Sequence, residues 1–425
     1  MKKLLLLGLG AFAVFLALVL PNHFGMLKWS SFAKFPLELL VILSLAIAFG
    51  RQAWVVWSFA LLLTALTFMK LADIGMFMAY NRTFNPILDA VLINAGIGLL
   101  SDSIGVFLTY LAVAGAVIAL ILWLFALVHS LRAWASLSLP NGARVAAIMV
   151  AIVFGGWSVA DAGHHLGYWK FESSPPGTAW SSRLVTKRAI AMRATTLDLR
   201  QFSKAAANDA YADAQGLLNG LDKHEVIFIY IESYGRASFD NPLYAPTHVT
   251  TLQENEASIK AAGFDMRSGW LTSPTAGGQS WLAHGAMATG LWTSDNGRYA
   301  AMLASGHKWL FHFAQDAGYR TSTVMPAITM AWPESSKMGF ELVIPATDIP
   351  YKGERFNWVT MPDQFTLATY PELLPDDPRP EFLQIALISS HAPWVPVPDM
   401  VAWDEVGNGT IFNEMAASGP TPREL

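Results

Sequence analysis

The sequence predicts an α-helical membrane domain followed by an α/β domain with a mostly parallel central sheet. Only 14% of the 425 residues are charged, whereas about 25% is usual for a soluble domain. Charged residues are scarcest in the first 165 positions, where five long apolar stretches lie. Beyond residue 220, apolar runs of strand character alternate with helical patterns, which is typical of βαβ units.

Each of the five apolar stretches approaches the roughly 20 residues that a transmembrane helix needs. They cover residues 4–20, 35–50, 53–69, 105–129 and 145–162. The first could instead be a signal peptide, but no small-x-small cleavage site follows it, so we expect a retained helix. If all five span, Lys2, Lys3, Arg51, Arg132 and Arg144 fall on one side, whereas Lys28, Lys34 and Arg82 fall on the other. This pattern predicts a cytoplasmic N-terminus and an extracytoplasmic C-terminal domain.

Polar residues inside this half raise two further expectations. The segment 70–103 is amphipathic and carries Asp73, so we expect it at the outer membrane interface, where it either helps to admit a lipid or simply connects helices. Glu38 and Asp161 are expected near helix ends, where water reaches them easily.

The predicted organisation is a transmembrane domain over 1–165, a helical linker over 166–220 and an α/β domain over 221–425. The run "EVIFIYIE" has the character of a strand in the middle of a sheet and ends on Glu232, and "EFLQIALISSH" ends on His391. Functional side chains gather at the carboxyl ends of parallel strands. The absence of cysteine excludes disulfides and thiolate metal sites, and a net charge of −4 without a basic stripe argues against nucleic acid.

The stretch "SPTAGGQSWLAHGAMATG", residues 273–290, combines a tight glycine turn with the start of a helix. Ser280 is expected at or near that start, where backbone amides stabilise an anion. Serine needs a base or a metal to become a good nucleophile, and a cation held partly by Glu232 would provide one. Two alternatives stay open: Ser280 as an ordinary helix N-cap, and Thr275 as the nucleophile.

The ordered set "IYIESYGR", "GGQSW", "AWPESSKMGFE", "WVTMPDQF" and "LISSHAPW" resembles the membrane-anchored sulfatase-like enzymes of the alkaline phosphatase superfamily. Lipoteichoic acid synthase, phosphoglycerol transferases and phosphoethanolamine transferases belong to that family. The resemblance covers nearly the whole chain, including the plan of a five-helix anchor with an outward catalytic domain. A formylglycine sulfatase is excluded, because the cysteine and the C/S-x-P-x-R motif are missing.

The resemblance implies roles for four residues. Glu232 matches a metal-ligating acid, and Ser280 matches a nucleophile that also ligates the metal and forms a covalent phospho-enzyme. Trp332 and His391 match residues that line the phosphoryl-group pocket. It further implies a divalent cation, Mn²⁺ or Zn²⁺, a phospholipid donor of a phosphoglycerol-like headgroup, and an acceptor such as a glycan or glycerophosphate polymer, at the inner membrane of a bacterial cell.

One departure from the family pattern weakens the metal site. The family completes it with an Asp-His pair beyond the histidine of "SSHAPW", and this sequence has no Asp-His dipeptide. The chain therefore resembles a family member shortened at its C-terminus. A catalytically silent membrane relative and a periplasmic phosphodiesterase without lipid preference stay as alternative functions.

Overall fold

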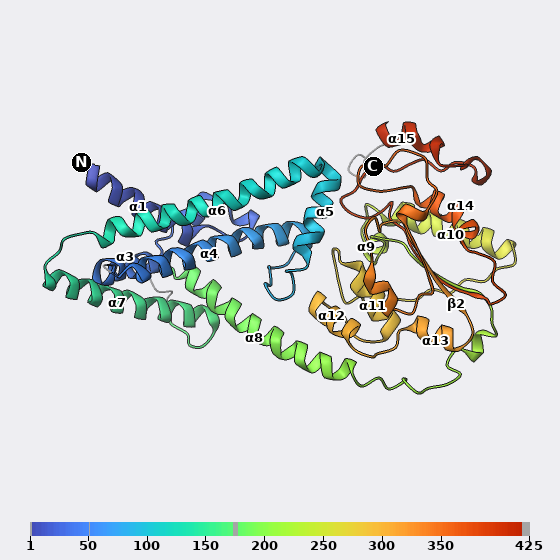
Figure 1. Cartoon of the computed structure of the whole chain (residues 1–425), viewed down its shortest axis with the longest axis horizontal. Coiled ribbons are helices and arrows are strands. Elements are labelled where there is room, and N and C mark those ends of the chain that lie inside the picture. The colour runs from blue at the N-terminus through green and yellow to red at the C-terminus, as the bar shows by residue number, and fades with distance from the viewer. Residues whose placement is uncertain (1, 51, 173–176, 419–425) are drawn as a thin grey trace. The chain divides into compact units, whose positions relative to one another are not determined.

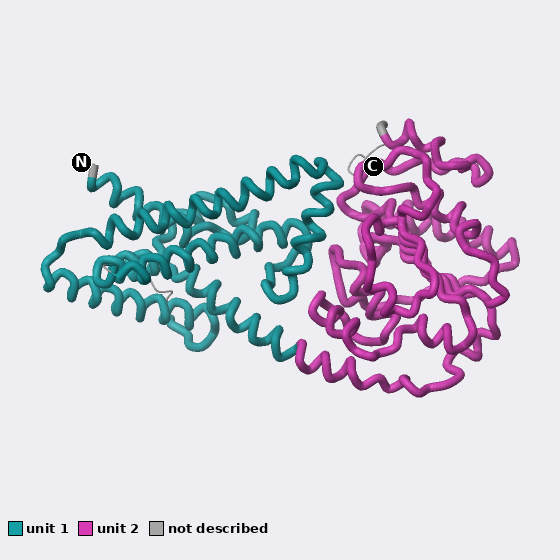
Figure 2. Tube along the Cα trace, in the orientation of Figure 1, with its two compact units in different colours: residues 1–198 teal, residues 199–425 magenta. Residues whose placement is uncertain are grey.

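The computed structural model describes residues 2–50, 52–172 and 177–418, and the chain divides into two compact units. Unit 1 is Met1–Asp198 and unit 2 is Leu199–Leu425 (Figure 2). The division falls inside helix α8 (Trp180–Ala206), which occupies about half of the predicted linker. Each unit has its own hydrophobic core.

Unit 1 is built from helices, and each predicted apolar stretch forms one of its principal helices. These are α1 (Lys2–Val19), α3 (Leu37–Phe49), α4 (Ala53–Tyr80), α6 (Val106–Ala135) and α7 (Asn141–Leu166) (Figure 1). Shorter elements are η1 (Phe24–Met26), α2 (Trp29–Phe32) and α5 (Leu92–Ile104). Within the described residues, α4, α6 and α7 are the three helices long and apolar enough to cross a membrane, while α1 and α3 are shorter.

Helix α3 is the shortest of the five principal helices. Its 13 residues rise about 20 Å, whereas a bilayer core is about 30 Å thick. Pro36 precedes the helix and Gly50 ends it. A Cβ at Gly50 would lie only 2.3 Å from the Cβ of Ala135, so glycine permits the end of α3 to approach α6 closely.

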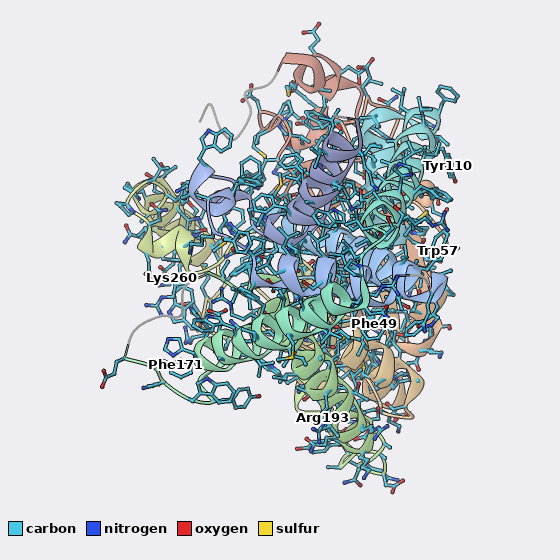
Figure 3. The ribbon with its side chains drawn as sticks, turned by 90° about the vertical axis from the view of Figure 1, so that its left-hand side faces the viewer. Phe49, Trp57, Tyr110, Phe171, Arg193 and Lys260 are labelled. Carbon is cyan, nitrogen blue, oxygen red and sulfur yellow. The ribbon has the colours of Figure 1, made fainter. Side chains whose placement is uncertain are left out.

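Large apolar side chains cover the outside of unit 1. On α6, for example, Phe107 is 79% exposed and Tyr110 is 64% exposed, and Figure 3 shows Tyr110 at the periphery of the helices. The core instead joins α1, α3, α4 and α6 through residues such as Val14, Ala60 and Leu127. An apolar exterior around three membrane-length helices is consistent with membrane association.

Glu38 and Asp161 lie near helix ends as predicted, in the first turn of α3 and near the end of α7, but the expectation that water reaches them there is wrong, because both are buried. The Ser182 amide donates a 2.8 Å hydrogen bond to Glu38 Oε1, and the Ala179 amide donates a 2.9 Å bond to Asp161 Oδ2. The first amides of a helix have no partners within it and carry partial positive charge. Two acids from α3 and α7 therefore fix the start of α8.

The segment 70–103 does not form a single interfacial element. Lys70 and Asp73 belong to α4 and are fully buried. The Lys70 ammonium donates to the carbonyls of Ala17 and Leu18 at 3.0 and 2.8 Å and to the Ser181 hydroxyl at 3.0 Å. The contacts of Lys70 and Asp73 therefore indicate a packing role for this part of the segment.

Unit 2 contains a four-stranded parallel sheet in the order β1-β4-β2-β3. The strands are β1 (Val226–Tyr230), β2 (Arg320–Met325), β3 (Leu342–Pro345) and β4 (Glu381–Ala386). The α-helices are α9 (Ala237–Asp240), α10 (Ala245–Ala261), α11 (Ser280–Thr289), α12 (Asn296–Ala304), α13 (Leu310–Asp316), α14 (Asp363–Leu373) and α15 (Asn413–Ser418). The 3₁₀ segments are η2 (Asn219–Leu221), η3 (Pro333–Lys337), η4 (Ala346–Asp348), η5 (Trp403–Glu405) and η6 (Thr410–Phe412).

The two faces of the sheet pack against different cores. Successive side chains of a strand point to opposite faces. Leu383 and Ile385 of β4 accordingly join a core that includes α14, whereas Phe382 joins a core that includes α11, α12 and α13 (Figure 1). The predicted alternation of strands and helices is therefore present as a small parallel sheet with helices on both faces.

The prediction that "EVIFIYIE" runs in the middle of the sheet is wrong, because β1 is an edge strand. Phe228 packs inward against Phe382, with ring centroids 5.3 Å apart. On the opposite side, Ile227 and Ile229 are 40% and 45% exposed. The core around Leu383 thus ends at β4, and one face of β1 is left open.

Candidate functional site

The carboxyl ends of β1 and β4 bring two of the predicted residues to one edge of the sheet. Glu232 follows the last residue of β1 by two positions, and the pairing continues beyond the strands because the Leu387 amide donates a 2.9 Å hydrogen bond to the Tyr230 carbonyl. The Ser390 hydroxyl then donates a 2.6 Å bond to the Glu232 carbonyl. The backbone of Glu232 therefore lies directly beside the residue that precedes His391.

The Glu232 side chain is half-buried. Among the described residues, no hydrogen bond or ion pair of its carboxylate occurs. Arg236, the nearest cation along the chain, instead binds Asp240 at 2.8 Å and lies over the ring of Trp270. The carboxylate is thus free to meet a ligand.

Ser280 is the first residue of α11, and the turn before it depends on unusual backbone angles. Gly277, Gly278 and Gln279 have φ values of 74°, 122° and 62°, a left-handed region that glycine adopts without strain. Gln279 occupies the N-cap position, so the alternative of Ser280 as the N-cap is wrong. The half-buried Ser280 hydroxyl makes no hydrogen bond to the described part of the chain.

Helix α11 is held against β1 by a contact between Tyr230 and His284. Their rings stack with centroids 3.7 Å apart, and the Tyr230 hydroxyl lies 2.9 Å from Met287 Sδ. Burial lowers the pKa of His284 to about 4 and raises the pKa of Tyr230 to about 12, so both side chains are neutral near pH 7. Ser280 is one helical turn from this contact along α11, and Glu232 follows Tyr230 by two residues, in the turn after β1.

His391 lies in a loop that Asp363 organises. Asp363 Oδ1 accepts hydrogen bonds from the amides of Ile388 and Ser389 at 2.8 and 2.9 Å, and the Asp363 amide donates to Ser389 Oγ at 2.8 Å. Burial raises the pKa of Asp363, although these hydrogen bonds oppose that shift. The His391 ring packs edge-on against Trp358, with centroids 5.2 Å apart.

Asp363 is the functional-site residue that sequence reasoning misses. It lies in "WVTMPDQF", where Pro362 and Asp363 mark a helix start. That signal predicts a helix-terminal acid, and nothing in it indicates that the carboxylate also binds a loop 25 residues later.

Among the described residues, no hydrogen bond or ring contact joins Trp332 or Thr275 to Glu232, Ser280 or His391. Trp332 packs beside Phe340, with ring centroids 6.2 Å apart, against a hydrophobic core of unit 2. Its described contacts are therefore packing contacts. Thr275 lies in the loop before α11, where its amide donates to Ser273 Oγ at 3.2 Å.

The donor set at this edge is incomplete for a tightly held cation. Glu232 and Ser280 would supply two oxygens, and within the described residues no three of His, Asp and Glu gather closely enough to hold a metal. A structural or catalytic Zn²⁺ site normally has three or four protein ligands. The residues described here do not by themselves fit a closed Mn²⁺ or Zn²⁺ site.

Comparison with known proteins adds no relative: no protein-family model, no curated protein and no solved structure matches this chain.

Proposed function

We propose that unit 2 moves or hydrolyses a phosphoryl-linked group, with Ser280 as the nucleophile. The observation that carries the proposal is the stacking of His284 on Tyr230. It holds α11, and therefore Ser280, against the strand that leads into Glu232. A free hydroxyl at the start of a ten-residue helix and a free carboxylate at a strand end are the two groups that such chemistry needs.

We propose roles in this reaction for three side chains and for the start of α11. Ser280 Oγ gives its proton to the Glu232 carboxylate and forms a bond to phosphorus while the bond to the leaving alkoxide breaks, and the amides at the start of α11 stabilise the phosphoryl oxygens. His391 donates a proton to the leaving oxygen. An acceptor hydroxyl or water then attacks phosphorus and gives its proton to His391, while the bond from phosphorus to Ser280 Oγ breaks and Ser280 regains its proton from Glu232.

We infer that the donor is a phospholipid such as one with a phosphoglycerol headgroup, because the site belongs to a chain with a membrane unit. In this proposal unit 2 has an alkaline-phosphatase-like fold, all five principal helices of unit 1 span the inner membrane of a bacterial cell, and the N-terminus is cytoplasmic. The acceptor, a glycan or a glycerophosphate polymer, stays open. Trp332 contributes to the substrate pocket.

A direct test measures headgroup release from phosphatidylglycerol by the full chain in detergent, with Mn²⁺ or Zn²⁺ supplied. Ser280→Ala is expected to reduce release by about 10³-fold or more, since nucleophile removal in comparable sites has effects of this size. Thr275→Ala is the matched control and should retain activity. A phosphorylated Ser280 peptide, detected by mass spectrometry, would identify the covalent intermediate. Equal loss in both variants, or a modified Thr275, would contradict the assignment.

The catalytically silent alternative rests on the incomplete donor set. Calorimetric titration of the full chain with Mn²⁺ and Zn²⁺ separates it from the enzyme. Binding that Glu232→Gln weakens supports the catalytic proposal, whereas no binding and no turnover would leave the silent relative. Equal turnover of a soluble diester and of phosphatidylglycerol would instead favour a phosphodiesterase without lipid preference.

A further inference from the structure

Unit 1 contains a cavity of about 350 Å³ where α1 ends and α3 and α8 begin. This volume is within the range of about 300–1,000 Å³ that is typical of ligand pockets. Its walls are mainly apolar and come from segments far apart in the sequence, including Leu18, Val19, Met26, Lys34, Thr178 and Trp180. The Thr178 and Phe35 backbones bond at 3.0 Å and hold these segments together.

Lys34 is the charged residue in this lining. Its side chain is exposed, and it takes part in no ion pair or hydrogen bond with residues 2–50, 52–172 or 177–418. Ser30, which also lines the cavity, offers a hydroxyl as a second donor. The polar part of the cavity therefore presents a cation and a hydroxyl, the groups that recognise a phosphate.

The neighbouring charges are already paired and do not neutralise Lys34. Asp73 binds Arg188, and Asp161 lies 3.4 Å from Arg183. Glu38 is turned toward the Ser182 amide and does not line the cavity. An anion beside Lys34 would therefore meet an unopposed positive charge.

The surface around the cavity has the character of a membrane interface. Trp29 is 90% exposed, and Phe24 and Phe35 are 63% and 46% exposed. Aromatic side chains, tryptophan above all, concentrate at the depth of the lipid headgroups. A ligand in this cavity would therefore contact apolar side chains as well as the charge of Lys34.

We propose that this cavity binds an anionic phospholipid, with the phosphodiester beside Lys34 and Ser30 and the acyl chains along the apolar wall of Leu18, Val19 and Met26. A phosphate alone would leave that apolar wall uncovered. The proposal concerns a lipid ligand of unit 1 and does not depend on the reaction of unit 2.

The test measures lipid binding to the full chain in detergent by native mass spectrometry, with phosphatidylglycerol, phosphatidylcholine and soluble glycerol 3-phosphate as probes. We expect phosphatidylglycerol to bind more tightly than phosphatidylcholine, and glycerol 3-phosphate not to bind at matched concentration. Lys34→Gln should weaken phosphatidylglycerol binding about fivefold, the effect of one basic residue near a lipid surface, and should weaken phosphatidylcholine binding less, because the choline cation offsets the charge of the phosphodiester.

Lys28→Gln is the matched control, because Lys28 is an exposed lysine of the same connection between α1 and α3 that does not line the cavity. A second variant, Ser30→Phe, should reduce binding by filling the cavity while leaving every charge in place. Equal phosphatidylglycerol binding by Lys34→Gln and Lys28→Gln would overturn the proposal. Binding of glycerol 3-phosphate as strong as that of the lipid would also overturn it, since the site would then be one for a free phosphate.

Discussion

The Ser390 hydroxyl and the Glu232 carbonyl form a 2.6 Å hydrogen bond beyond the last paired residues of β1 and β4. The bond lies where the chain leaves β1 and Ser233 adopts a left-handed conformation, with φ of 62°. It fixes the direction of the backbone at Glu232. The candidate site therefore depends on a side chain from the loop of β4 to hold the end of an edge strand.

Ser390→Ala should loosen this junction. Removal of one hydrogen bond to a part-buried carbonyl costs about 1 kcal/mol of unfolding free energy, and amide hydrogen exchange over residues 231–233 should become faster. Ser258→Ala is a suitable control, because that hydroxyl bonds an exposed carbonyl in α10. Unchanged exchange at 231–233 would show that β1 holds its end without Ser390.

Asp363→Ala should displace the loop that carries His391. The substitution leaves the amides of Ile388 and Ser389 without their acceptor, and an unsatisfied buried donor costs about 1–3 kcal/mol. If His391 protonates the leaving group, turnover of phosphatidylglycerol should fall and its pH profile should change. Asp363→Asn keeps an acceptor oxygen and should recover part of both properties.

Asp376→Ala serves as the control for Asp363, since Asp376 is exposed on the loop before β4. A loss of stability without a change in the pH profile would restrict Asp363 to a purely structural role.

Local patterns predict much of unit 2. The run "EFLQIALISSH" contains β4, and the polar stretch "HVTTLQENEASIKAAG", residues 248–263, has the composition of a helix and lies largely within α10. Strand pairing is different, because it depends on which apolar faces are covered by distant segments. An apolar run predicts a strand equally well at the centre or at the edge of a sheet, so the edge position of β1 could not be read from its residues.

In the candidate site too, local sequence patterns predict single residues but do not predict the contacts between distant segments. Glu232 lies just beyond a strand end as predicted and the glycine pair indicated the turn before Ser280, whereas His391 lies in a loop five residues beyond β4. The stacking of His284 on Tyr230 and the bonds from Asp363 to 388–389 join segments 25 or more residues apart. In unit 1, buried Glu38 and Asp161 bind the first amides of α8, a pairing that hydropathy does not reveal.

The pH dependence of stability should report the burial of His284. Its folded pKa of about 4 is below the unfolded value of about 6.5, so the folded state binds fewer protons. Stability is then full above pH 6.5 and is lost as the pH falls toward 4. Between pH 7.5 and pH 5, the protonation of His284 should lower the free energy of unfolding by up to about 2 kcal/mol.

His284→Phe keeps a ring against Tyr230 but cannot titrate. Chemical unfolding at pH 7.5 and pH 5 should show a smaller difference in free energy for this variant than for the wild type. His312, whose pKa burial also lowers, is present in both proteins and cancels in the comparison. An identical pH dependence in the two proteins would mean that His284 is accessible to solvent.

The buried Asp73 should be the most sensitive residue of unit 1. Its carboxylate pairs with Arg188 of α8 and accepts hydrogen bonds at 2.8 Å from Asn22 Nδ2 and from the Phe84 amide. Asp73→Asn removes the negative charge and leaves the buried guanidinium of Arg188 unpaired, a change that costs about 3–5 kcal/mol when one partner of a buried pair is lost. Thermal unfolding of the full chain in detergent should show a large decrease in the midpoint, and proteolysis within α8 should become faster.

Asp102→Asn, an exposed substitution on α5, should change neither property. The double variant Asp73→Leu with Arg188→Met removes both charges and should recover part of the stability, because two apolar side chains leave no unpaired charge. If the double variant were less stable than Asp73→Asn alone, the network would stabilise α8 through its hydrogen bonds rather than through the pairing of charges.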